Sequence, residues 1–153
     1  MILINSMLYN EIGKGVDQMK KLFILILTSA LLICLTGCGG NVRNVKIQKW
    51  ETSQIYSDKD IEDAIKVIIK EFDSSWKGCT LTEITYAGDE KTLAHQEWAS
   101  RHNTDEAIVL ISSFDVDSSG GNGSLNPNST YTRWTWILVR NKNGRWKHVD
   151  HGY

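Results

Sequence analysis

The clearest hydrophobic pattern in the chain lies over residues 58–75, where apolar positions recur with the period of an α-helix. They fall at i, i+3, i+4, i+7, i+8 and i+11, and are Ile61, Ala64, Ile65, Ile68, Ile69 and Phe72. Ser57 can cap the first turn, and Asp58 and Asp60 lie at the positive end of the helix dipole. The pattern predicts one long amphipathic helix whose charged face is in solvent.

Four later segments have the composition or alternation of β-strands. Residues 79–87 are rich in Thr, Ile and Tyr, and residues 107–116 begin with a run that is apolar on both faces, which is typical of a central strand. Residues 131–141 alternate and place Trp134 and Trp136 on one face. Asn143-Gly144 then predicts a tight turn into a last strand, so the final two strands form a hairpin.

Residues 91–101 predict a shorter helix between the first two strands, with Leu93, Ala94 and Trp98 facing inward. The order of elements therefore predicts an α+β fold, in which a long and a short helix pack on one face of a four-stranded antiparallel sheet. This layout is similar to the cystatin-like and NTF2-like class of small domains.

The start of the chain has the layout of a signal peptide over residues 19–37. Met19-Lys20-Lys21 is cationic, and a largely apolar run of 14 residues follows from Leu22 to Leu35. A membrane span wants about 20 apolar residues, so this run favours a cleaved signal. Residues 1–18 carry two acids against one Lys and are interpreted as an extension from a mis-assigned start, the alternative being a long n-region.

Leu35-Thr36-Gly37-Cys38 resembles the lipobox of bacterial lipoproteins. The resemblance implies that Cys38 becomes the first residue and carries a diacylglyceryl thioether, a lipid that holds the protein on the bilayer at the extracytoplasmic face of the cell membrane. Residues 38–51, with Gly39-Gly40 and no hydrophobic period, are expected to be a flexible tether before the folded domain of residues 52–153.

The charge and the cysteine content of this domain limit which partners and which thiol chemistry are expected. Residues 38–153 carry 14 of the 17 Lys and Arg and 16 of the 18 Asp and Glu, so no basic field is available for a phosphate backbone and we expect no nucleic-acid partner. Cys34 leaves with the signal and Cys38 is alkylated, which leaves Cys79 as a lone thiol, expected to be buried.

Several segments of the domain resemble small lipoproteins of Gram-positive bacteria that carry an uncharacterised C-terminal domain of about a hundred residues. They are Ser112 to Gly121, Gly123 to Tyr131, Trp136 to Arg140 and Gly144 to Tyr153. The resemblance covers the whole folded part and brings no activity with it.

The connection of residues 117–130 is the leading candidate for a recognition surface, because it is long for a link between adjacent strands. Its polar side chains are Ser118, Ser119, Asn122, Asn126 and Asn128. Asp115, Asp117 and Ser119, followed by Gly120, also match the opening of a calcium loop, but Asn126 stands where such a loop has a bidentate Glu. The alternative is an ordinary loop whose Asp and Ser side chains satisfy turn amides.

Histidines and tryptophans supply the remaining candidates. Alternation places His148 and Asp150 on one face of the last strand, where they could act as a base and its orienting carboxylate, with His151 on the other face. A metal site there would need His95 or His102 as well. Trp134 and Trp136 could stack on sugar rings, although filling the core is the favoured interpretation.

The sequence thus predicts a lipid-anchored binding or structural module, with no cofactor besides the acyl lipid and with an envelope protein or ligand as its partner. No catalytic motif is present, so we expect no enzyme. The alternatives are a small pocket enzyme of the NTF2-like class and a calcium-binding loop module. The partner and the oligomeric state stay open.

Overall fold

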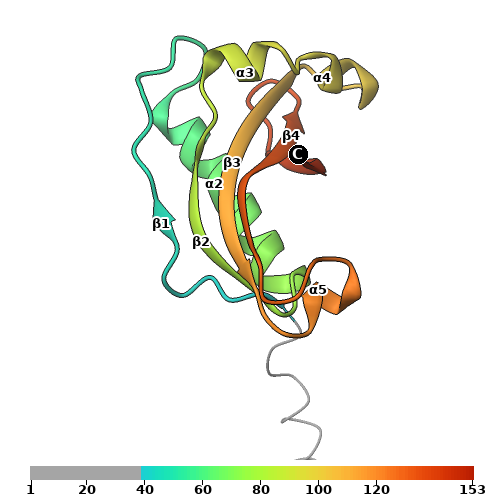
Figure 1. Ribbon diagram of the computed structural model, residues 1–153. Coiled ribbons are helices and arrows are strands. Elements are labelled where there is room, and N and C mark those ends of the chain that lie inside the picture. The colour runs from blue at the N-terminus through green and yellow to red at the C-terminus, as the bar shows by residue number, and fades with distance from the viewer. Residues whose placement is uncertain (1–38) are drawn as a thin grey trace, which may run out of the picture. The chain divides into compact units, whose positions relative to one another are not determined.

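The computed structural model of the protein describes residues 39–153, so the start extension, the signal segment and Cys38 lie outside the described residues. The described part is an α+β fold with a five-stranded mixed sheet in the order β1-β2-β3-β4-β5. Figure 1 shows α3 and α4 at one end of the curved sheet and α5 near the opposite end. The elements are β1 (Lys46–Ile47), α2 (Asp58–Ser75), β2 (Cys79–Tyr86), α3 (Asp89–Leu93), α4 (Glu97–Arg101), β3 (Glu106–Val116), α5 (Gly120–Gly123), β4 (Thr130–Arg140) and β5 (Lys147–Gly152).

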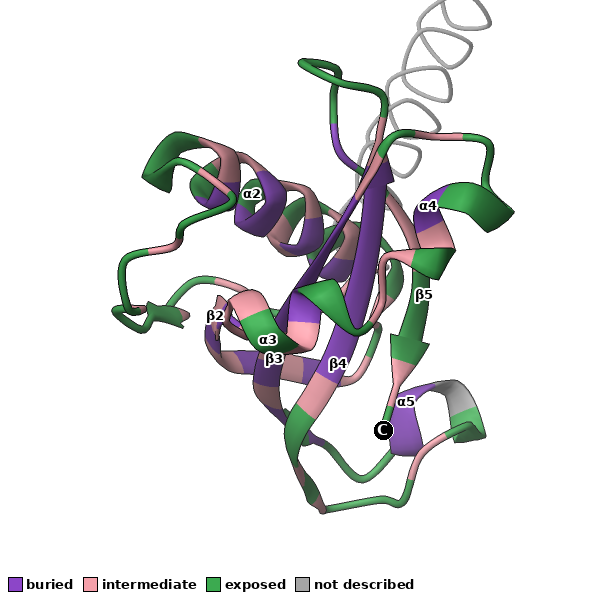
Figure 2. Cartoon of the chain, turned by 90° about the horizontal axis from the view of Figure 1, so that it is seen from above, coloured by how far each residue is buried: buried purple, intermediate pink, exposed green. Residues whose placement is uncertain are grey.

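The long helix α2 has the predicted bounds. Ser57 and Asp60 form a capping box: the Ser57 Oγ accepts from the Asp60 amide at 3.2 Å, and the Asp60 carboxylate accepts from the Ser57 amide at 3.2 Å. Figure 2 shows burial concentrated on one side of α2 and along the middle of β3 and β4. Among the described helices, none is both long and apolar enough to cross a bilayer.

The sheet contains the four predicted antiparallel strands and one strand that the sequence did not predict. β1 pairs in parallel with β2, with Lys46 opposite Glu83. Upstream of β1, the Gly40 amide donates to the Phe72 carbonyl at 2.9 Å and the Asn41 amide donates to the Cys79 carbonyl at 2.8 Å. The expected tether is therefore in contact with the domain, because Val42 and Val45 pack on its core, and the fold begins earlier than the sequence indicated.

The predicted helix of residues 91–101 is two short helices, α3 and α4. Leu93 is 58% exposed and Ala94 is also exposed, so the prediction that they face inward was wrong. The inward residues are Thr92 and Ala99. Between the helices, the Gln96 amide group donates to the Ala107 carbonyl at 2.7 Å and accepts from its N–H at 3.2 Å, and these bonds fix the chain to the sheet where the helix breaks.

The helices also lie on both faces of the sheet, which corrects the prediction of a single helical face. Successive residues of a strand point to opposite faces. Ile108 belongs to the core beneath α2, whereas Ala107 packs with Ala99 of α4 and with Val139. α2 therefore covers one face, and α4 covers part of the other.

Arg140 joins three elements at the end of β4. Its Nη1 donates to the Asp60 carboxylate at 2.6 Å and its Nε donates to the Glu106 carboxylate at 2.5 Å. The guanidinium carbon also lies 4.1 Å from the centre of the Trp146 ring. Since only 9% of the Arg140 side chain is exposed, these contacts form in a largely dry environment and hold the start of α2 to the sheet.

Candidate functional site

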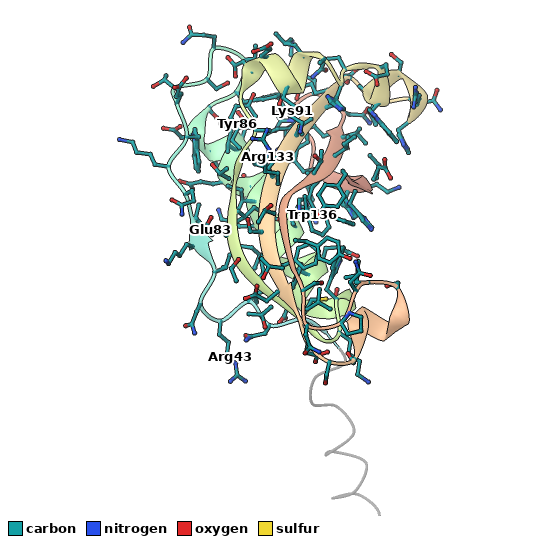
Figure 3. The ribbon with its side chains drawn as sticks, viewed as in Figure 1. Arg43, Glu83, Tyr86, Lys91, Arg133 and Trp136 are labelled. Atoms are coloured by element: carbon teal, nitrogen blue, oxygen red, sulfur yellow. The ribbon has the colours of Figure 1, made fainter. Side chains whose placement is uncertain are left out.

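Trp76, at the C-terminal end of α2, lies at the centre of an aromatic cluster on the α2 face of the sheet. It stacks on Phe72 at 5.1 Å and makes edge contacts with Trp134 at 5.9 Å and with Trp136 at 4.9 Å. Figure 3 shows Trp136 among neighbouring aromatic rings beside β4. Trp134 and Trp136 do share a face, as predicted.

These two tryptophans nevertheless differ in exposure. Trp136 is fully buried, and its Nε1 donates to the Ser112 Oγ at 2.8 Å, so it fills the core and is closed to a sugar ring. Trp134 is half-buried, and its indole N–H is buried without an acceptor among the described residues. Leaving such a donor unpaired costs about 1–3 kcal/mol. Of the pair, only Trp134 can take part in binding.

Trp134 lines a pocket of about 480 Å³ between the C-terminal end of α2, the loop that carries α5, and strands β4 and β5. Aromatic and aliphatic groups form much of the wall, and Glu71 and Lys77 bring one charge of each sign. The lining residues are Glu71, Ser75, Trp76, Lys77, Cys79, Gly121, Ser124, Leu125, Trp134 and His151. We refer to this cavity as the aromatic pocket.

The loop of residues 117–130 is held by its own hydrogen bonds. The Asp117 carboxylate accepts from the Ser119 hydroxyl at 2.5 Å and from the Ser119 amide at 2.7 Å, and these bonds lower the pKa of Asp117. The Asp115 carboxylate accepts from the Thr130 hydroxyl at 2.6 Å. The candidate calcium ligands therefore satisfy turn and strand groups, and residues 39–153 contain no group of three or more acidic, His or Cys side chains arranged to hold a metal ion.

The predicted recognition residues of this loop lie mostly on the surface. Ser118, Ser119, Asn126 and Asn128 are exposed, and of Asn122 only the backbone is described. The Asn126 amide donates to the Tyr131 hydroxyl at 3.1 Å, which anchors the far end of the loop. The loop contributes Gly121, Ser124 and Leu125 to the aromatic pocket.

Sequence reasoning proposed the loop and the tryptophan face separately, and the structure brings them together at this pocket. It missed Trp76, Glu71 and Leu125 as wall residues. One feature of the sequence could have indicated that the loop packs on the domain: Leu125 is an apolar residue in an otherwise polar loop, and it packs against the core.

The predicted pairing of His148 with Asp150 does not form, because β5 contains a bulge. Leu138 lies opposite His148 and Ile137 lies opposite Asp150, so the two residues follow opposite faces of the sheet. Asp150 instead lines a second pocket, of about 550 Å³, on the α4 side. The His148 ring contacts the Asp150 main-chain carbonyl at 3.1 Å, and the carboxylate is not placed to orient it as a base.

The same bulge brings His148 and His151 onto one face. Their rings stack with centres 5.2 Å apart, and the His151 Nδ1 lies 3.2 Å from the His148 Nε2. Burial of the ring and the neighbouring His151 both lower the pKa of His148, so its imidazole is neutral at neutral pH.

The other histidines and Cys79 have local roles. The His95 Nδ1 lies 2.8 Å from the Lys91 carbonyl, and the His102 ring stacks on Trp98 at 5.9 Å. Cys79 is buried, as expected, and burial raises the pKa of its thiol, which keeps the thiol protonated and unreactive.

Comparison with known proteins found no matching family model, no matching curated protein and no matching solved structure. The features of the protein that bear on its function are therefore the geometry of the aromatic pocket and the pattern of the N-terminal sequence.

Proposed function

We propose that the protein is a lipid-anchored extracytoplasmic binding module, and that its domain binds a glycan of the cell envelope in the aromatic pocket. Binding is supported chiefly by one observation: a cavity of about 480 Å³ is lined by Trp76 and Trp134 together with the loop residues Ser124 and Leu125. Sugars present apolar ring faces and a rim of hydroxyls. A site with indole rings and a few polar groups suits both.

The anchoring part is supported by the signal pattern and the lipobox that ends at Cys38. Two acyl chains on that residue would give stable attachment, where a single chain would be marginal. The proposal includes membership of the small Gram-positive lipoproteins that the domain resembles, and a fold of the cystatin-like or NTF2-like class. A long helix against a meander of antiparallel strands supports the second assignment.

Anchoring is tested by growing cells with radiolabelled palmitate. The wild-type chain should incorporate the label and sediment with membranes, and Cys38→Ala should lose both properties. A Cys38→Ala protein that keeps the label or remains in the membrane fraction overturns the anchoring proposal.

Glycan binding is tested with soluble peptidoglycan fragments and with chitotriose as a simple probe, using the full chain in detergent and its tryptophan fluorescence as the readout. Ser124→Phe should fill the pocket and abolish the fluorescence change. Ser118→Phe is the matched control, because Ser118 is an exposed serine of the same loop that does not line the pocket.

The glycan proposal fails if neither probe changes the fluorescence, or if Ser124→Phe and Ser118→Phe respond as the wild type does. An enzyme is the second candidate class, but His148 and Asp150, the base and orienting acid that the sequence suggested, lie on opposite faces of the sheet.

A further inference from the structure

We propose that His148 and His151 form a binding site for a first-row transition-metal dication of the kind that prefers imidazole ligands. Cu²⁺ and Zn²⁺ are the ions that should bind most tightly. The site is defined by three lone-pair atoms: the His148 Nε2, the His151 Nδ1 and the Asp150 main-chain oxygen. This inference does not require the glycan proposed for the aromatic pocket, although the two sites share one residue, because His151 also lines that pocket.

The first support is the distance between the donors. The two ring nitrogens are 3.2 Å apart, and the His148 Nε2 is 3.1 Å from the Asp150 oxygen. Donors that bind one Zn²⁺ at about 2.0–2.1 Å are about 2.9–3.4 Å from each other, for angles between a right angle and the tetrahedral value. The observed spacing falls within this range before any side chain moves.

The second support comes from counting protons. A ring nitrogen of neutral His carries either one proton or one lone pair. If the His148 Nε2 is protonated, its single proton serves both the His151 nitrogen and the Asp150 oxygen. If it is unprotonated, its lone pair faces that of the carbonyl. A cation among the three atoms satisfies all of them at once.

The surroundings also favour a cation. Glu71 and His151 line the same pocket, and the negative charge of Glu71 acts on His148. The His151 ring lies 5.1 Å from that of Trp76, and the His148 ring lies 5.3 Å from that of Trp136. The two indole rings therefore border the site, and the face of an indole ring attracts a cation that lies within about 6 Å of its centre. β5 is an edge strand and His151 is exposed, so an ion can enter from solvent.

The site differs from the metal sites considered from the sequence. His95 and His102 are not needed, and the Asp150 carboxylate, which lies on the opposite face, takes no part. Two imidazoles and one carbonyl leave coordination positions open for water.

The test is calorimetric titration of the full chain in detergent with CuCl₂ and with ZnCl₂. One ion per chain should bind, with Cu²⁺ tighter than Zn²⁺, and CaCl₂ and MgCl₂ should give no heat. His148→Gln and His151→Gln should each weaken binding about tenfold or more, because each removes a nitrogen donor. His102→Gln is the matched control, since it removes a histidine outside the site, and it should bind as the wild type does.

Two further readouts separate this site from adventitious binding. Asp150→Asn keeps the carbonyl and removes the carboxylate, so affinity should be unchanged. The electron paramagnetic resonance spectrum of the Cu²⁺ complex should contain hyperfine lines from two nitrogens, and should lose one set in His151→Gln, whose exposed position protects the fold. Equal binding by the wild type and both histidine variants, or a need for the Asp150 carboxylate, overturns the proposal.

Discussion

Replacement of Arg140 by Met tests whether the contacts at the end of β4 hold the start of α2 to the sheet. Met keeps most of the length and apolar contact of the side chain but removes the charge and its donors. Asp60 and Glu106 would then be left close to each other without a counter-charge.

The expected loss of unfolding free energy is about 2–4 kcal/mol. Breaking a fully buried ion pair costs about 3–5 kcal/mol, because an uncompensated charge stays in the interior. The carboxyl side chains of Asp60 and Glu106 are 31% and 26% exposed, so water recovers part of that cost. Loss of the cation–π contact with Trp146 adds about 0.5–2 kcal/mol.

The assay is urea unfolding followed by tryptophan fluorescence. A loss of this size should lower the midpoint by about 1–2 M, given a slope of roughly 2 kcal/mol per molar urea. Arg101→Met is the matched control: Arg101 also lies over an indole, 5.1 Å from the Trp98 ring centre, but it is exposed, so its replacement should cost less than about 0.5 kcal/mol.

A second substitution separates the charge effect from packing. Adding Glu106→Gln to Arg140→Met removes one uncompensated carboxylate and should recover part of the lost stability. If Arg140→Met costs less than about 1 kcal/mol, or if Glu106→Gln makes the Met variant worse, the reasoning about this junction is refuted.

Four further predictions concern the helix cap, acid stability, the loop contact and alkaline stability. Ser57→Ala should cost about 1 kcal/mol in urea unfolding. Hydrogen bonds from Ser57, and then from Arg140, lower the pKa of Asp60 in the folded protein. The stability that its carboxylate contributes is therefore present above the pKa of the unfolded state and is lost as the pH falls through the pKa of the folded state. Asp60→Asn should make the melting temperature fall less steeply as the pH is lowered. Gly78→Ala should lower the melting temperature, since Gly78 has φ +76° and a Cβ there would lie 2.4 Å from the Ser119 Oγ; an unchanged melting curve would contradict that contact. Burial raises the pKa of Tyr56 to about 12, so its contribution holds below pH 10 and is lost between pH 10 and 12, and Tyr56→Phe should show less alkaline destabilisation.

The elements that sequence predicted well are those whose stability is encoded locally. For α2, the cap at Ser57 and the repeat of apolar residues independently predict the same helix, and the observed bounds match the prediction. β3 was predicted to within one residue because its apolar run is long and distinct.

The features that sequence missed depend on partners far along the chain. α3 and α4 are held by Thr92 and Gln96, polar residues that bind the main chain of β3. The apolar residues of this segment therefore gave the wrong prediction, that Leu93 and Ala94 face inward. β1 is two residues long and depends on pairing with β2.

The histidine pair was missed for the same reason. Simple alternation assumes an unbroken pleat and separates His148 from His151. The bulge depends on how β5 pairs with β4, which residues 147–152 alone do not encode.

The docking of Gly40 against Phe72 has a consequence for where the protein can act. A flexible linker of a dozen residues has a root-mean-square end-to-end distance of about 20 Å, so it would let a domain move that far from its attachment point. Here the chain is bonded to the C-terminal end of α2 from Gly40 onward, and a Cβ at Gly40 would lie 2.6 Å from the Phe72 ring. With a lipid on Cys38, as proposed, only Gly39 separates the attachment point from the fold. Trp76, which lines the aromatic pocket, caps the same end of that helix. The pocket would then stay close to the bilayer, and its ligand would be a component of the envelope near the membrane rather than one at the outer surface.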